Sequence, residues 1–222
     1  MPDKKEALTQ GSLVIVLAAA ILAALCAGRY PVSMPDIFRL ITGAEPLDPR
    51  VKTVVFSLRL PRVILAVLAG AGLSAAGVSL QAMFGNPLVS SHILGVSASA
   101  GFGAALGILL FGRTWAIQLL AIVFGFGGMF IVYAMGQRRG KTGILLLVLS
   151  GVIVSAVFEA LTSLIKYIAD PEEKLPAITY YLMGSLSSAS YRDLFIAAPA
   201  ILAGIGALWF LPRRSRLSMA IS

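Results

Sequence analysis

Six long stretches of the chain are dominated by apolar residues, and short polar or basic segments separate them. A transmembrane helix needs about 20 consecutive, mainly apolar residues, and each stretch is close to that length. The stretches span roughly residues 12–28, 63–84, 92–111, 115–136, 143–168 and 194–211. The pattern predicts an all-α, polytopic membrane protein with about six transmembrane helices. Because hardly any apolar residue lies outside these stretches, residues 1–222 are expected to form a single transmembrane domain.

The first apolar stretch has a second interpretation. It follows Lys4 and Lys5, and a short basic start before an apolar body is also typical of a secretory signal. A lipoprotein cleavage site would need a small residue before Cys26, whereas Leu25 occupies that position. An uncleaved first helix is therefore the favoured interpretation.

Composition agrees with a membrane environment. Apolar residues make up 58% of the chain and charged residues 13%, whereas soluble domains carry about 25% charged residues. With Cys26 as its only cysteine, the chain cannot form an intramolecular disulfide, and no cysteine cluster is available for a metal. The sequence thus predicts no metal site and no cofactor.

The net charge of +8 raises the question of nucleic-acid binding. The basic residues, however, lie at the ends of apolar stretches and do not form a patch with interleaved aromatic residues, so no nucleic-acid partner is expected. Six spans place the amino terminus, segment 138–141 and segment 213–216 on one side, and all three are basic. The positive-inside rule predicts a cytoplasmic amino terminus in the cell membrane. The connection 29–62 then lies outside, although it too is rich in arginine.

Small residues recur at helical spacing in two of the stretches. In membranes such stripes let helices approach closely, so both stretches are expected to pack tightly against neighbours. The stripes are Gly95, Ser99, Gly103 and Gly107 in the third stretch, and Gly70, Ser74 and Gly77 in the second.

The fifth stretch carries an acidic residue at its centre. Glu159 shares one helical face with Ser155 and Ser163. A charge at mid-membrane costs about 2.5–3.5 kcal/mol on insertion scales, so Glu159 should not face lipid. Two interpretations stay open: the three side chains line a polar pathway, or Glu159 forms a structural hydrogen bond with a neighbouring helix. Lys166 lies two turns further on, too far for direct pairing, and is expected to extend towards the membrane surface.

The segment GQRRGKT, residues 136–142, looks at first like a phosphate-binding loop. That loop needs four residues between its glycines and a preceding strand. Here only Gln137, Arg138 and Arg139 separate the glycines, and a candidate membrane helix precedes them. The segment therefore does not predict ATP hydrolysis by this chain.

The segment RLPRVILAVLAGAGLSAAGVSLQAMFGNPLVSSHILGV, which begins at Arg59, resembles the FecCD family of ABC-transporter permeases, whose best-known member is the vitamin B12 permease. The resemblance combines the RLPR motif, the helix ending near Gln81, Asn86-Pro87-Leu88 and Leu94-Gly95-Val96. Ser150-Gly151 and YYLMGSLSSASYRDL extend it over essentially the whole chain. It implies the first half of the ten-helix permease fold.

What the family does follows from that resemblance. It implies a transport component and not an enzyme: a permease that forms a homodimer in the lipid membrane, takes substrate from a periplasmic or surface binding protein, and is driven by separate ATP-binding cassette subunits. The expected substrates are metal chelates, namely a ferric siderophore, haem or cobalamin, among which the sequence does not choose.

The resemblance also implies roles for individual residues. Asn86 and Leu88, in the turn after the second helix, and Thr142, before the fifth, match a cytoplasmic gate. Arg59 and Arg62 match arginines that form ion pairs with glutamates of the binding protein. A short helix is implied near residues 170–178, with Pro171 in its first turn; a solvated loop is the alternative there.

Family members continue beyond the point that matches Ser222, through a coupling helix and four more helices. We therefore expect a fragment, one piece of a complemented permease, or an inactive truncated permease. The alternative from another functional class is an ion-coupled carrier or channel in which Glu159 titrates. An intramembrane enzyme is disfavoured, since the chain has one histidine and one cysteine.

Overall fold

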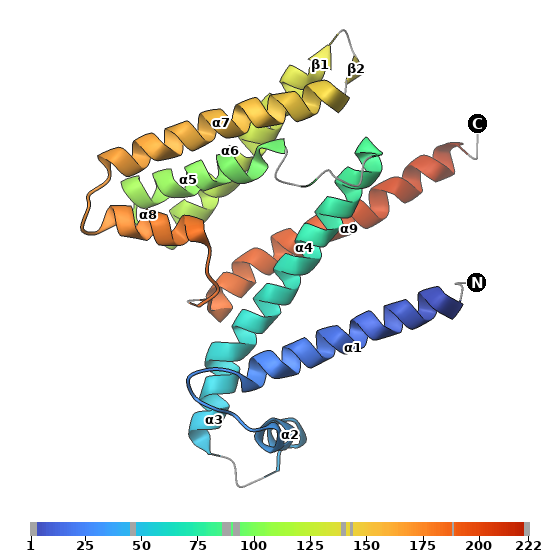
Figure 1. The fold of residues 1–222 in the computed structure, drawn as a ribbon, viewed down its shortest axis with the longest axis vertical. Coiled ribbons are helices and arrows are strands. Elements are labelled where there is room, and N and C mark those ends of the chain that lie inside the picture. Colours follow the sequence, from blue (N-terminus) through green and yellow to red (C-terminus); the bar gives the residue numbers. More distant parts are fainter. Residues whose placement is uncertain are drawn as a thin grey trace. The chain divides into compact units, whose positions relative to one another are not determined.

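The computed structural model describes residues 4–44, 48–85, 90, 94–138, 141–142, 144–187 and 189–219. This part of the chain is helical apart from one small hairpin, as Figure 1 shows. The elements are α1 (Lys4–Cys26), α2 (Met34–Thr42), α3 (Pro49–Thr53), the π-helix η1 (Val54–Arg59), α4 (Leu60–Phe84), α5 (Val96–Leu110), α6 (Thr114–Gly136), β1 (Gln137–Arg138), β2 (Lys141–Thr142), α7 (Ile144–Ile168), α8 (Lys174–Met183) and α9 (Tyr191–Met219).

The predicted all-α, polytopic architecture is confirmed. Each of the six apolar stretches contains one helix, and among the described residues five helical segments are long and apolar enough to cross a membrane. They are Lys5–Cys26, Pro49–Phe84, Thr114–Gly136, Leu145–Ile168 and Tyr191–Phe210. The sixth, α5, has 15 residues. At about 1.5 Å per residue it is shorter than a hydrocarbon core of about 30 Å.

Two compact units make up the described chain. One combines the described residues of Met1–Gly72 with Leu186–Phe210, and the other combines Leu73–Ser185 with the described end of α9. Each unit is considered by itself below.

In the first unit, a small apolar core joins the end of α1 to α2, α3 and η1. Its buried residues are Val32, Ile37, Val51 and Val55. α2 begins with a capping box, because Ser33 Oγ accepts a hydrogen bond from the Asp36 amide and the Asp36 carboxylate accepts one from the Ser33 amide. Next to this core, the Tyr191 hydroxyl of α9 donates a hydrogen bond to the carbonyl of Phe56, at 2.6 Å.

The π-helix η1 runs into α4 without a break. The amide of Leu60 bonds to the carbonyl of Val55, five residues earlier, whereas an α-helix bonds residues four apart. The ring of Pro61 in the first turn of α4 is fully buried. Proline has no amide hydrogen, so Pro61 donates no backbone hydrogen bond at this point of the continuous helix.

The second unit is built on close contacts between helices. α5, α6 and α7 lie side by side with α8 against α5 (Figure 1). A β-carbon at Gly107 would come within 2.7 Å of Ile117 Cα, and one at Gly103 would overlap the carbonyl of Leu120. The prediction of tight packing through the stripe in α5 is therefore confirmed. Three phenylalanine rings, Phe102, Phe124 and Phe158, contact one another beside it.

The stripe in α4 is different. A β-carbon at Gly70 or Gly77 would meet nothing within 4 Å. Within the described residues these two glycines thus have no close neighbour, and the role of this stripe stays a prediction.

The short helix implied near residues 170–178 is present as α8, but it begins at Lys174, later than expected. Pro171 lies in a turn before it and not in its first helical turn. The Asp170 carboxylate accepts a hydrogen bond from the Glu173 amide at 2.8 Å, and the Asp170 carbonyl accepts one from the Leu175 amide at 2.9 Å. These bonds use Asp170 to stabilise the turn, so the helix starts after it.

Candidate functional site

The first arginine of the RLPR motif, Arg59, lies at the end of η1 and points inward. Its side chain is 8% exposed. The guanidinium donates hydrogen bonds to the carbonyls of Leu25, Cys26 and Tyr30, the one to Cys26 at 3.0 Å. The last carbonyls of a helix have no intrahelical partners and carry partial negative charge. A fork of five N–H donors satisfies several of them at once, so Arg59 caps the end of α1.

Gly28 makes this cap possible. Its φ of +153° is one that side chains rarely adopt, and a β-carbon there would lie 2.5 Å from Nη2 of Arg59. The backbone can pass this close to the guanidinium only because no side chain intervenes. Burial, together with the hydrogen bond that its hydroxyl donates to Asp48, raises the pKa of the neighbouring Tyr30 above its usual 10.0.

The second arginine, Arg62, lies in the first turn of α4 and lines a cavity of about 530 Å³. The cavity lies between the end of α1, the turn after it and the η1–α4 helix. Its remaining lining is mostly apolar and includes no acidic residue; it comprises Ala24, Ala27, Gly28, Arg29, Tyr30, Val54, Leu58, Arg59, Val63, Ala66 and Leu186. The Nε of Arg62 is buried there without a hydrogen-bond partner among the described residues. The cavity therefore combines apolar walls with arginine side chains and no acidic residue.

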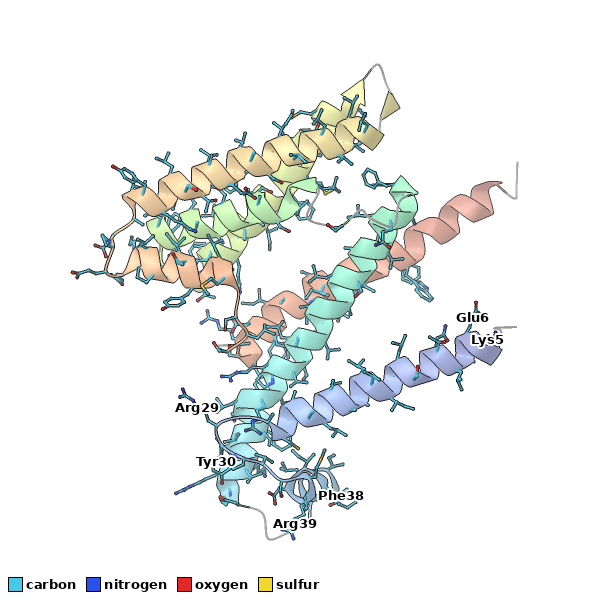
Figure 2. All side chains as sticks on the ribbon, viewed as in Figure 1. Lys5, Glu6, Arg29, Tyr30, Phe38 and Arg39 are labelled. Atoms are coloured by element: carbon cyan, nitrogen blue, oxygen red, sulfur yellow. The ribbon has the colours of Figure 1, made fainter. Side chains whose placement is uncertain are left out.

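Arg29 is the third arginine of this cavity, and the sequence did not single it out as a site residue. It is exposed, in the turn between α1 and α2, where Figure 2 shows it beside Tyr30. Arg59 and Arg62 are both expected to form ion pairs with glutamates of a binding protein. The structure brings both to one cavity, but it uses Arg59 within the chain and leaves Arg29 and Arg62 without ion pairs among the described residues.

A second, smaller cavity carries the acidic residue of α7. Its volume is about 270 Å³, and it lies between α5, α7 and α8. Glu159 and Ser163 line it and are exposed, and Thr162 and Lys166 line it too. Ser155 is half-buried and lies outside its lining, next to Gly95.

The hydroxyl groups of this cavity form hydrogen bonds within α7, whereas its carboxylate does not. The hydroxyl of Ser163 donates to the carbonyl of Glu159 at 2.9 Å, and that of Thr162 donates to the carbonyl of Phe158 at 2.8 Å. The Glu159 carboxylate forms no hydrogen bond or ion pair with any described residue. The structural hydrogen bond to another helix, one of the two interpretations of Glu159, is thus not found within the described part of the chain.

Of the three expected gate residues, the structure describes Thr142. Asn86 and Leu88 lie outside the described residues. Thr142 lies in β2, which pairs antiparallel with β1 so that Thr142 faces Gln137 across the hairpin. The element before this hairpin is helix α6 and not a strand, which agrees with the rejection of a phosphate-binding loop.

No metal centre emerges from the described residues, where no group of three or more His, Cys, Asp or Glu side chains could hold an ion. His92 lies outside the described part. Cys26 is a thiol whose Sγ lies 3.7 Å from the sulfur of Met34.

Comparison with known proteins identifies the family. The model of the FecCD transport family matches residues 15–220. The chain belongs to the FecCD transport family. The resemblance seen in the RLPR and Asn-Pro-Leu motifs is thereby confirmed, and the chain is a multi-pass membrane protein of the permease type.

Individual relatives agree with this assignment. The molybdate import system permease protein MolB of Haemophilus influenzae is 37% identical over 205 residues, which are 90% of this chain and 60% of MolB. The vitamin B12 import system permease protein BtuC of Shigella boydii is 31% identical over 83% of this chain and 54% of that protein. A solved inward-facing conformation of a metal-chelate type ABC transporter matches with a TM-score of 0.71 and 36% identity, covering 86% of this chain and 56% of that one.

This chain is shorter than the relatives that it matches. The chain spans 60% of MolB, 54% of BtuC and 56% of the solved transporter. It corresponds to somewhat more than half of each relative.

Proposed function

We propose that this chain is part of the membrane permease of an ABC importer that moves metal-chelate substrates across the cell membrane. The observation that carries the proposal is the family match along residues 15–220. ATP hydrolysis belongs to separate ATP-binding cassette subunits in this proposal, because the GQRRGKT segment lacks the spacing of a phosphate-binding loop and follows helix α6 where such a loop follows a strand. A second permease copy completes the path.

The proposed partner outside the membrane is a substrate-binding protein. The arginine-lined cavity supports this proposal, because its lining carries Arg29, Arg59 and Arg62 and no acidic residue, and a guanidinium is suited to binding a partner's carboxylate. This role requires the cavity to face outward and the amino terminus to lie in the cytoplasm, as the positive-inside rule predicts.

The proposed substrates are a ferric siderophore, haem or cobalamin, and the molybdate relative adds an oxyanion to the candidates. The test begins with an importer purified through an amino-terminal tag together with every subunit that accompanies it. Proteoliposomes containing it, its binding protein and ATP should accumulate one of the four labelled compounds. No ATP-dependent accumulation of any of them contradicts the proposal. Recovery of this chain without other subunits would instead favour the inactive truncated permease.

The gate is proposed for Asn86, Leu88 and Thr142, on the strength of their match to the family motifs. The pathway wall is proposed for Ser155, Glu159 and Ser163. Glu159 and Ser163 have support from the cavity that they line, whereas Ser155 lies beside it.

A second candidate function is an ion-coupled carrier or channel. It is favoured by one observation, the Glu159 carboxylate without a partner among the described residues. A carrier needs no ATPase, so uptake in the same proteoliposomes would persist without ATP and would follow an imposed pH gradient. Uptake that stops when ATP is omitted, with the gradient intact, excludes this candidate.

A further inference from the structure

Helix α2 of the first unit carries a row of large apolar side chains on its surface. Met34, Phe38 and Ile41 follow one another at intervals of four and three residues, so they share one face of the helix. These residues are between 55% and 75% exposed. The small apolar core formed by the described residues takes Ile37 and Leu40, which lie on a neighbouring side of the helix. An exposed apolar row of this kind marks a contact surface.

The side of α2 opposite this row is polar. An α-helix turns by about 100° per residue, which places Asp36 and Arg39 across the helix from the apolar row. The Asp36 carboxylate is used by the capping box with Ser33, whereas Arg39 is exposed. Figure 2 shows Phe38 and Arg39 leaving α2 in different directions. A helix with an apolar face opposite a polar face that carries a cation is typical of a segment that lies in a membrane interface.

The core of the unit holds α2 beside the ends of two candidate membrane spans. One span, Lys5–Cys26, ends before α2, and the next, Pro49–Phe84, begins after it. Ile37 of α2 lies in one buried cluster with Val55 of the second span, and Leu25 of the first span packs against that cluster. This packing keeps α2 at the level where both spans reach the membrane surface.

The direction of α2 is the one that an interfacial helix needs. In Figure 1 α2 is seen end-on, whereas α1 is seen from the side, so α2 runs across the direction of α1. Because α1 has the length and apolarity of a membrane span, α2 lies along the membrane surface. In that position a helix can bury its apolar face about 5–10 Å deep, at the boundary between headgroups and acyl chains.

The two faces of α2, its place in the chain and its direction fit one environment. We propose that α2 is an interfacial anchor, whose apolar row inserts among the acyl chains of the lipid bilayer while Arg39 binds lipid phosphate groups. A guanidinium is suited to this contact because its planar fork can bind a phosphate through two hydrogen bonds. The anchor holds the end of α1 and the start of the second span at a fixed depth. The inference needs the membrane location of the chain, and it does not depend on the proposed substrate or binding protein.

The test places a nitroxide spin label at single positions of α2 in the complete importer, in vesicles of phosphatidylcholine and phosphatidylglycerol. Phe38→Cys and Ile41→Cys carry the label on the apolar row, and Arg39→Cys carries it on the polar side. Cys26→Ser removes the chain's own thiol, and the cysteines of the other subunits are likewise replaced. Relative to a water-soluble nickel chelate, oxygen should reach the two labels on the row about fivefold more readily than the label at residue 39, because oxygen concentrates in lipid and the row is buried there.

Two results would overturn the anchor. Equal access of the chelate to all three labels would place α2 in water. Labels on the row that neither oxygen nor the chelate reaches would show that a protein surface covers it, either a second permease segment or the binding protein. The measurement needs no substrate and no ATP, so either failure is distinct from a failure of the proposed import function.

The role of Arg39 is tested separately, by comparing the mixed vesicles with vesicles of phosphatidylcholine alone. The preference of the label at residue 38 for oxygen should be higher in the mixed vesicles, because an arginine near the surface is attracted to anionic lipid. Arg39→Gln should remove this difference. Arg50→Gln should keep it, since Arg50 is an exposed arginine of the same unit outside α2. A preference that does not depend on phosphatidylglycerol, or that responds to it equally in both variants, overturns the assignment of Arg39.

Discussion

The ammonium group of Lys174, in the first turn of α8, donates a hydrogen bond to the carbonyl of Leu109 in the last turn of α5. It does for α5 what Arg59 does for α1, because a basic side chain from a later element caps the carbonyl end of an earlier helix. The contact joins residues 65 positions apart. Below it, Ile178 of α8 is fully buried against α5 and α7.

Replacing Lys174 should therefore loosen α8. In Lys174→Met, the carbonyl of Leu109 loses its partner, and we expect the free energy of unfolding to fall by about 1 kcal/mol. Thermal unfolding in detergent measures it. Lys174→Arg should restore most of the loss, and Lys5→Met, at an exposed site on α1, should have no effect. Equal melting temperatures for Lys174→Met and the wild type would show that the bond adds nothing to stability.

Close approach of α5 and α6 predicts an unequal response of two glycines to the same change. Gly103→Ala places a β-carbon on the backbone of Leu120 and should cost about 1–3 kcal/mol, because backbone atoms must move. Gly127→Ala meets nothing within 4 Å and should leave stability unchanged or raise it, since alanine favours helix. Chemical unfolding of both variants in the same detergent is the comparison. A Gly103→Ala variant as stable as Gly127→Ala would contradict the packing.

Glu159→Gln should leave ATP-driven uptake largely intact. The amide keeps the shape of the side chain and removes a charge that is costly near the centre of a membrane. An ion-coupled carrier that titrates this group would lose its transport instead. Initial uptake rates in proteoliposomes decide the matter, with Glu172→Gln, in the exposed turn before α8, as the control.

The start of α2 should respond to acid. The hydrogen bond with Ser33, supported by the charge of Arg39, lowers the pKa of the Asp36 carboxyl below its usual 3.8. A carboxyl whose pKa is lower in the folded state stabilises the helix at any pH above its unfolded-state pKa. This stabilisation is lost as the pH falls through the folded-state pKa. Amide exchange in α2 should therefore be slow at neutral pH and accelerate below about pH 4, after correction for the intrinsic rate.

Asp36→Asn provides the control for this effect. It should exchange faster than the wild type at neutral pH and show little further change on acidification. A wild-type helix whose corrected exchange is independent of pH down to the acid limit of the experiment would show that the capping box does not depend on the charge of Asp36.

Much of the fold was predictable because a membrane-spanning helix requires a long stretch of apolar residues, which the sequence shows directly. All six stretches contained a helix, and the spacing of Gly103 and Gly107 correctly indicated close packing of α5. The start of α8 was not predictable in the same way. Pro171 and the two glutamates after it favour a first helical turn, but the Asp170 carbonyl accepts from the amide of Leu175, five residues on, whereas an α-helix bonds residues four apart, so these residues form a turn.

Local sequence motifs predicted which residues belong to the candidate site, but not the contacts that these residues make. The RLPR motif pointed to Arg59 and Arg62, and both reach the large cavity. Nothing near Arg59 in the sequence indicates that its partners are carbonyls 29 to 34 residues earlier. The one available signal was Gly28 directly before Arg29, a glycine and an arginine in a turn that follows a helix. A glycine and an arginine in such a turn do not by themselves indicate a contact with Arg59, and the contact is seen only in the folded chain.

The π-helical turn before α4 gives this helix one place where its length can change. In an α-helix each residue advances the chain by about 100° around the axis, so a deletion inside α4 would rotate everything on one side of it by that angle. A π-turn accommodates one residue more than an α-turn, so deleting a single residue from Val54–Arg59 would let the segment relax into ordinary α-helix. The residues on either side would then keep nearly the same rotational phase, because the residue removed is the one that the wider turn had absorbed. The expected cost of such a deletion is therefore limited to the contacts of the residue that is lost.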